Sequence, residues 1–251
     1  MEERTRVKPA GEPRENLDSR DAYRVHTELP PRGFKGCTVF DCFGAGQKVS
    51  QRTFDGRSWR ADPRTREAMF STFSIVRRLH ELLWCLDQAI ALVHNTSDTA
   101  PLRANCEHVL VISNQRPDQL RELDVDAEFD RARPILIEAS ELARGSRGTA
   151  ERNPHDGHRL YPGSDLMGAK LAKANLCGVT LRGSVLIRAD LRSAQLTGCD
   201  VLGVDMRDAN LSGADLGGAI YLTQMQVNSA HGDDATILPA GFSRPSHWSA
   251  R

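Results

Sequence analysis

Large apolar residues recur at every fifth position between residues 164 and 223. The stretch divides without insertion into twelve five-residue units, from SDLMG to AIYLT. The third residue of each unit is large and apolar, and the first is small or of modest size. The third residues are Leu166, Leu171, Leu176, Leu181, Leu186, Leu191, Leu196, Val201, Met206, Leu211, Leu216 and Tyr221. We predict that these side chains line one continuous core.

A period of five matches neither an α-helix nor an extended strand. It is satisfied if the chain makes a short straight run, turns a corner and repeats, so that every third residue points inward. Four runs then return the chain over its start, and twenty residues make one coil. At a strand spacing of ~4.8 Å, three coils stack to roughly 15 Å.

Three of the units, ADLRS, ANLSG and ADLGG, fit the consensus A(D/N)LXX fully, and the others fit it in part. On these residues the chain resembles the pentapeptide-repeat proteins. The resemblance implies a right-handed quadrilateral β-helix over residues 163–223. We therefore expect an α+β fold, in which this β-helix solenoid is joined by an α-helical block and a C-terminal cap.

Residues 32–61 can also be divided into five-residue units, and most of their central positions are large and apolar. A glycine follows every second central position by two residues. The central positions are Phe34, Val39, Gly44, Val49, Phe54 and Trp59. We interpret this segment as a degenerate part of the same β-helix. The alternative is an ordinary irregular β segment.

An α-helical block is predicted for residues 62–145. Asp62 and Pro63 are typical of a helix start, and an apolar stripe with steps of three and four continues to about His94. We expect a second helix over residues 101–112, a short turn over 118–123, and a last helix over 132–144 with Pro134 near its first turn. The block either interrupts one β-helix or packs beside it.

The remaining segments connect or close these parts. Residues 1–31 are rich in charge and proline and predict a disordered or loosely draped arm. Residues 146–162 form a polar linker. Thr223 and Gln226 have capping-box spacing, so residues 224–251 are predicted to begin with a short helix and to cap the open end of the solenoid.

Charge and composition narrow the function classes. Lys plus Arg and Asp plus Glu both number 33, so direct binding to nucleic acid is not expected. No run is long and apolar enough for a transmembrane helix, and the first twenty residues lack the apolar region of a signal peptide. We expect a cytoplasmic protein without membrane contact, whose six cysteines are reduced thiols.

The candidate catalytic and metal-binding motifs are all incomplete. Residues 44–46 read GAG, without the third glycine of a dinucleotide-binding loop, and His80-Glu81 begins an HExxH motif without its second histidine. Zinc could bind Cys37 and Cys42 with His26, but their spacing of five also suits inward positions of adjacent repeats. His155 and His158 fit a solvated loop. We expect no enzyme activity, cofactor or metal.

The resemblance carries one specific functional hypothesis. Some pentapeptide-repeat proteins imitate DNA with an acidic β-helix, bind DNA gyrase, and confer protection or antibiotic self-resistance. Residues 164–223, however, contain six aspartates and six basic residues. We therefore expect a non-catalytic scaffold that binds an unidentified protein partner through the β-helix surface and the helical block.

Three segments resemble a set found in actinobacterial pentapeptide-repeat proteins. They read FKGCTVFDCFGAGQKVSQ, RRLHELLW and LTQMQVNSAHGDDATILPAGFSRPSHW. Proteins of this family often dimerise through one end of the β-helix, so the resemblance is compatible with a homodimer, although the sequence does not fix the oligomeric state. The resemblance brings no established activity to these segments.

Overall fold

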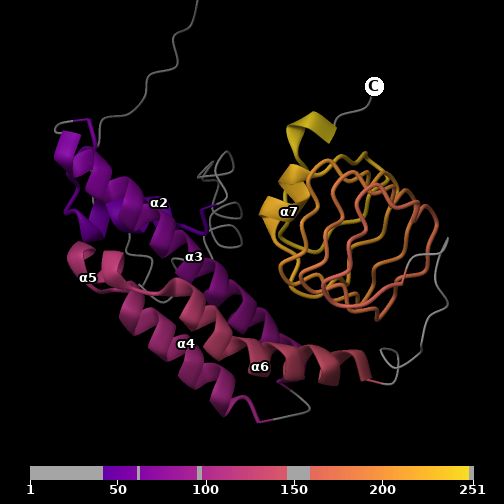
Figure 1. The fold of residues 1–251 in the computed structure, drawn as a ribbon, viewed down its shortest axis with the longest axis horizontal. Helices are drawn as coiled ribbons and strands as arrows, with labels where there is room; N and C mark the ends of the chain where they lie inside the picture. Colours follow the sequence, from indigo (N-terminus) through magenta and orange to yellow (C-terminus); the bar gives the residue numbers. More distant parts are fainter. Residues whose placement is uncertain (1–41, 61–62, 95–97, 146–158, 249–251) are drawn as a thin grey trace, which may run out of the picture.

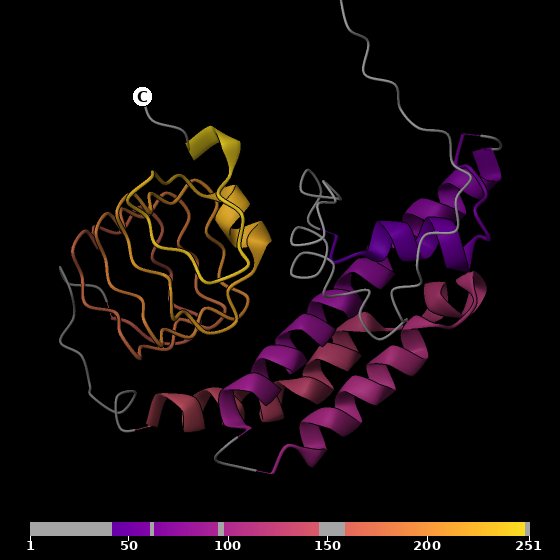
Figure 2. The same cartoon turned by 180° about the vertical axis from the view of Figure 1, so that it is seen from behind.

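The computed structural model describes residues 42–60, 63–94, 98–145 and 159–248. These residues form two units that lie side by side (Figure 1). Helices between residues 45 and 144 make the helical unit, and residues 164–223 make a stack of coils on which the C-terminal segment lies. The view from behind in Figure 2 shows the same arrangement.

Helix α3 is the central element of the helical unit and contacts α2, α4, α5 and α6. Its apolar side chains at steps of three and four, such as Val76, Leu79, Leu83 and Leu86, are at most 1% exposed. Burial of such a stripe supplies most of the stability of a packed helix. The helices are α2 (Ala45–Lys48), the π-helix η3 (Val49–Thr53), α3 (Pro63–Val93), α4 (Ala100–Ser113), α5 (Pro117–Glu122) and α6 (Val125–Arg144).

Helix α6 begins earlier than the predicted start at residue 132, and that prediction is wrong. Asp124 caps it, because the Asp124 side chain accepts a hydrogen bond from the Ala127 N–H at 3.1 Å. Pro134 therefore lies inside the helix rather than in its first turn. Pro134 is on the exposed face, where water can satisfy the carbonyl that proline leaves unpaired.

Residues 42–60 do not continue the repeat, so the predicted degenerate β-helix is wrong there. The chain is helical over residues 45–53, and the Phe54 N–H donates to the Val49 carbonyl at 3.0 Å. A hydrogen bond between residues five apart defines a π-helix, and here it joins two of the positions assigned to the repeat, Val49 and Phe54. The rest of that prediction lies outside the described residues.

In the coil stack, residues twenty apart in sequence pair with each other. Parallel bridges join Asp165 to Val185 and Val185 to Asp205, and equivalent bridges occur on the other three sides. The Leu166 N–H donates to the Val185 carbonyl at 2.8 Å, and the Val185 N–H donates to the Ser164 carbonyl at 3.0 Å. Each coil is thus hydrogen-bonded to the next along four sides.

The predicted α+β class with a β-helix is wrong. The described residues contain helices but no strands, and the coils are joined only by isolated bridges. Each five-residue unit contributes one bridging residue and then turns. Neighbouring residues therefore never pair in succession, and no strand ladder forms.

The corners of the coils require a left-handed backbone at the fifth position of most units. Gly168 and Gly183 have φ of 65° there, and glycine reaches this region without strain. Lys173, Arg188, Ser193 and Asp208 occupy equivalent corners at φ of 55–61°. The corner geometry is therefore kept even where the residue pays a steric cost.

Residues 224–248 lie on the last coil. Helix α7 (Gln224–Ser229) begins with the predicted capping box of Thr223 and Gln226. In the segment after it, His231 forms a parallel bridge with Asn210, and Ile237 forms one with Asp215. The 3₁₀-helix η5 (Ser246–Trp248) buries Trp248, whose indole N–H donates to the Ala230 carbonyl at 2.7 Å.

No described helix combines the length and apolar character needed to cross a bilayer.

Candidate functional site

The helical unit meets one side of the coil stack, the side that carries Asp200 and Ile220. Ile220 and Tyr221 belong to the same apolar core as the buried side chains of the helices. The Tyr221 hydroxyl donates to the Leu136 carbonyl of α6 at 2.7 Å, and the Trp84 indole N–H of α3 donates to the Leu222 carbonyl at 3.3 Å. We call this contact region the junction.

A buried carboxylate is the centre of the junction. Asp200 is 0% exposed and accepts hydrogen bonds from the Ser140 hydroxyl at 2.5 Å, from Arg182 Nη1 at 3.1 Å and from the Leu202 N–H at 3.1 Å. Burial of an ionised carboxylate is costly unless it is paired and hydrogen-bonded. Asp200 meets both conditions: the coils supply Arg182 and the Leu202 N–H, and α6 adds the Ser140 hydroxyl.

Two arginines extend the network between the units. Arg144, at the end of α6, donates to the Gly178 carbonyl at 3.3 Å and to the Ser140 hydroxyl at 3.2 Å. Arg182 also lies 3.7 Å from the Glu141 carboxylate. Charged groups from α6 and from two coils are therefore interleaved across the junction.

The Cys85 thiol and the Tyr221 phenol at the junction are held in their neutral, protonated forms. Burial raises the pKa of the Cys85 thiol far above its usual range, and the neighbouring carboxylates of Glu81 and Asp200 raise it further. Burial likewise raises the pKa of the Tyr221 phenol. A reactive cysteine needs a lowered pKa, so Cys85 fits a structural role.

A second buried polar group lies inside the helical unit. His80 is 1% exposed, and its Nδ1 is 2.7 Å from the Phe43 carbonyl oxygen. Burial lowers the pKa of His80 to about 4. The imidazole is thus neutral near pH 7 and donates from Nδ1, which ties the start of the described chain to α3.

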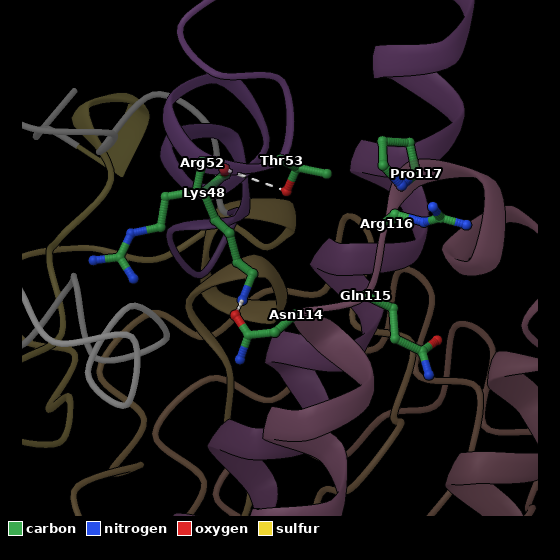
Figure 3. Close-up of a pocket in the computed structure, with 7 residues that line it drawn as sticks. All are labelled: Lys48, Arg52, Thr53, Asn114, Gln115, Arg116 and Pro117. Atoms are coloured by element: carbon green, nitrogen blue, oxygen red, sulfur yellow. Dashed lines mark hydrogen bonds between the residues drawn. The ribbon is translucent and has the colours of Figure 1, made fainter.

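A shallow hollow of about 180 Å³ lies between η3 and the α4–α5 turn. Its lining includes three basic side chains, Lys48, Arg52 and Arg116, and the Lys48 ammonium donates to Asn114 Oδ1 at 2.6 Å. Burial, together with the charge of Arg52, lowers the pKa of Lys48 to about 8. Figure 3 shows Arg52 and Arg116 extending in opposite directions, so their charges do not converge on one ligand position.

Several outward charges of the coil stack are paired with charges of the opposite sign. Arg192 bonds Asp190 at 2.7 Å, and Arg207 bonds Asp205 at 2.6 Å. Hydrogen bonds from these arginines lower the pKa of both carboxyls. The surface of the stack therefore presents alternating charge rather than a row of free carboxylates.

Comparison with known proteins agrees with this repeat geometry. The family described as "Pentapeptide repeats" matches residues 164–201 and 196–220, with eight copies. "Uncharacterized protein YybG" of Bacillus subtilis (strain 168) is 45% identical over 241 residues, which cover 96% of this chain and 85% of the relative. The chain belongs to the pentapeptide-repeat family. Because this relative comes from Bacillus, the narrower actinobacterial resemblance is not confirmed.

The twelve apolar positions of the pentapeptide repeat are all buried, and the first eleven lie in the core of the coil stack. Each of them, from Leu166 to Tyr221, is at most 1% exposed. The small first-position residues are buried beside them, including Cys199 at 0%. Tyr221 differs from the other eleven, because its ring joins the core of the helical unit.

The other candidate residues of the sequence do not form a site. Cys42 is buried, whereas Cys37, His26, His155 and His158 lie outside the described residues. No group of three or more His, Cys, Asp or Glu side chains within the described part of the chain is arranged to hold a metal ion. The GAG sequence begins in a turn at Gly44, which has φ of 76°, and its Ala45 and Gly46 start helix α2.

Sequence reasoning missed the role of Asp200, which it counted among the outward charges. The missed indication is the composition of one side of the pentapeptide stack. Leu202, Ile220 and Leu222 occupy nominally outward positions on that side, and all three are apolar. An apolar outward side predicts that another element covers it.

Proposed function

We propose that this protein is a non-catalytic scaffold that binds a protein partner through the free sides of its coils and its helical unit. Pentapeptide-repeat proteins are repeat proteins, and such surfaces commonly mediate protein interactions. The observation that carries the proposal is the junction. Its buried charged groups join the two units, and its thiol and phenol are held neutral.

The coil sides away from the junction suit a polar protein interface. Exposed Asn175, Gln195 and Thr197 share one side, and the paired Asp190 and Arg192 lie on the adjacent one. A rigid surface loses little conformational entropy on binding, which favours association. The homodimer and the cytoplasmic location remain predictions of the sequence.

Site-specific photo-crosslinking tests the proposal. A photoreactive amino acid replaces Thr197 or Gln195 on an exposed side of the coils, or Glu122 on the surface of α5, and the same proteins kept in the dark are the control. We expect the irradiated coil probes to capture one defined protein in the native host, and the α5 probe to capture the same protein if it lies within reach. Unselective labelling of many proteins from every position would refute the scaffold.

The alternative prediction, protection of DNA gyrase, finds little support in the surface charge. A DNA mimic needs unpaired carboxylates at phosphate-like spacing. Here Asp190 and Asp205 are neutralised by arginines, and Asp200 is buried. A supercoiling assay with quinolone separates the two functions, because only the gyrase function predicts protection by the purified protein.

A further inference from the structure

We propose that the end of the helical unit away from the coils binds an acidic protein segment. The surface consists of Trp59 and Phe70 with the four exposed arginines that are nearest to them in the sequence, and we call it the arginine–aromatic surface. The arginines are Arg57, Arg60, Arg64 and Arg66. The inference deepens the proposed scaffold function, on which it rests, by naming a surface and a partner chemistry.

The two aromatic rings form an exposed apolar platform. Trp59 is 39% exposed and Phe70 is 55% exposed, and their ring centroids are 5.9 Å apart. Figure 1 places the start of α3 at the end of the helical unit that lies farthest from the coils. Exposed aromatic pairs of this kind are typical centres of protein interfaces.

The guanidinium groups at this surface have no carboxylate partner in the described part of the chain. Six surface arginines elsewhere pair with carboxylates: Arg116, Arg131, Arg133, Arg188, Arg192 and Arg207. The stretch contains Asp55 and Glu67, but neither forms an ion pair with these four arginines. Within the described residues, the four arginines thus have no carboxylate partner, and two of them lie against the Trp59 ring of the platform.

Stacking holds two of these arginines in place. The guanidinium carbon of Arg60 is 4.6 Å from the centroid of the Trp59 ring, and that of Arg66 is 5.7 Å away. A stacked guanidinium keeps its in-plane N–H groups free for bidentate bonds to a carboxylate. The surface is therefore preorganised for carboxylates that flank an apolar side chain.

A protein segment fits this surface better than a single-stranded nucleic acid. A base would need the face of the Trp59 ring, where Arg60 and Arg66 already lie. The chain has zero formal net charge, whereas nucleic-acid binding relies on many phosphate contacts. Carboxylates can bind the guanidinium edges without displacing the stack.

Selection from a random dodecapeptide display library on the full-length protein tests the proposal. We expect the selected peptides to be enriched in Asp and Glu around an aliphatic or aromatic residue. Synthetic copies should bind roughly tenfold more weakly to the Arg60→Gln/Arg66→Gln variant and to Trp59→Ala, and more weakly at high salt. Arg131→Gln/Arg133→Gln, at exposed arginines of α6, is the matched control and should bind unchanged.

Several outcomes would overturn the inference. These are no enrichment, enrichment without acidic residues, or equal binding by the Arg60→Gln/Arg66→Gln variant with unchanged circular dichroism. Stronger, equally variant-dependent binding of a single-stranded oligonucleotide would assign the surface to nucleic acid instead. If the peptide experiment fails but the photo-crosslinking probes on the coils still capture a partner, only this inference is refuted. If the coil probes capture no partner, the scaffold function is refuted, whatever the peptide experiment shows.

Discussion

Removal of the Arg182 guanidinium tests how the junction holds the two units together. Arg182 Nη1 and Nη2 lie 3.1 Å and 3.7 Å from the carboxylates of Asp200 and Glu141, and its side chain is 14% exposed. In Arg182→Met, the Asp200 carboxylate at 0% exposure loses its ion-pair partner and cannot reach water. Breaking a buried pair in this way costs about 3–5 kcal/mol. We expect Arg182→Met to lower the free energy of unfolding by roughly 3 kcal/mol.

The opposite substitution should cost less, because the two partners differ in exposure. Asp200→Asn keeps an oxygen for the Leu202 N–H, and the partly exposed Arg182 keeps Glu141 and water. We expect a loss of about 1–2 kcal/mol. The double variant Arg182→Met/Asp200→Asn should be more stable than Arg182→Met alone, because no charge is left buried without a partner.

Urea unfolding, followed by far-ultraviolet circular dichroism and by tryptophan fluorescence, measures these differences. Trp84 lies at the junction, so a separate loss of the junction would appear as transitions that do not coincide. The matched control is Arg192→Met, which removes an exposed ion pair from the same coils and should have a much smaller effect. An Arg182→Met effect no larger than the control, or strict additivity in the double variant, would refute the reasoning.

Three further predictions concern the interior. Because the pKa of His80 is lowered in the folded state, the unfolded chain binds a proton first as the pH falls, and stability is lost between about pH 6.5 and 4. The free energy of unfolding should drop by about 2 kcal/mol between pH 7 and 5. His80→Asn keeps a donor for the Phe43 carbonyl and should flatten this slope in unfolding measured as a function of pH. Gly232→Ala places a Cβ 2.6 Å from the Trp248 ring and should cost about 1–3 kcal/mol, with faster proteolysis of the C-terminal segment than in wild type. Leu191→Ala should cost about 2–5 kcal/mol in urea unfolding, because its side chain is 0% exposed in the coil core; an unchanged midpoint would contradict that packing.

The positions of the buried coil residues could be predicted from sequence because each unit repeats the same local solution. A large third residue and a small first residue recur at every side, so one unit such as ADLRS at residues 189–193 states the rule for all. The absence of strands could not be predicted in the same way. Period five indicates where the chain turns, but it does not say whether one or several residues pair before each turn.

The segment before α3 shows why an apolar period alone can mislead. Val49 and Phe54 are five apart, which fits a five-residue repeat as well as a π-helical hydrogen bond. Only the burial of the segment against α3, where Phe43 accepts from His80, decides between them. This long-range contact has no local sequence pattern.

The junction was also beyond sequence reasoning, because it depends on two segments that are distant in the chain. In the sequence, Asp200 resembles any outward polar residue of a repeat, and Ser140 resembles any surface residue of a helix. Their 2.5 Å hydrogen bond gives both residues their role. The apolar Leu202 and Ile220 were the available indication that this side is covered.

A repeat stack presents a particular problem for any element that packs on it, because its sides resemble one another. The apolar Leu202, Ile220 and Leu222 distinguish the covered side, but an apolar helix face could still slide along it by one coil with little loss of buried area. Asp200 removes this freedom, since only one placement of α6 brings Ser140 to it and Arg144 to the Gly178 carbonyl. Buried polar groups often specify register in this way, even where they add little stability. We therefore interpret the junction network as the feature that fixes which coil sides stay free, and thus which surfaces a partner can reach.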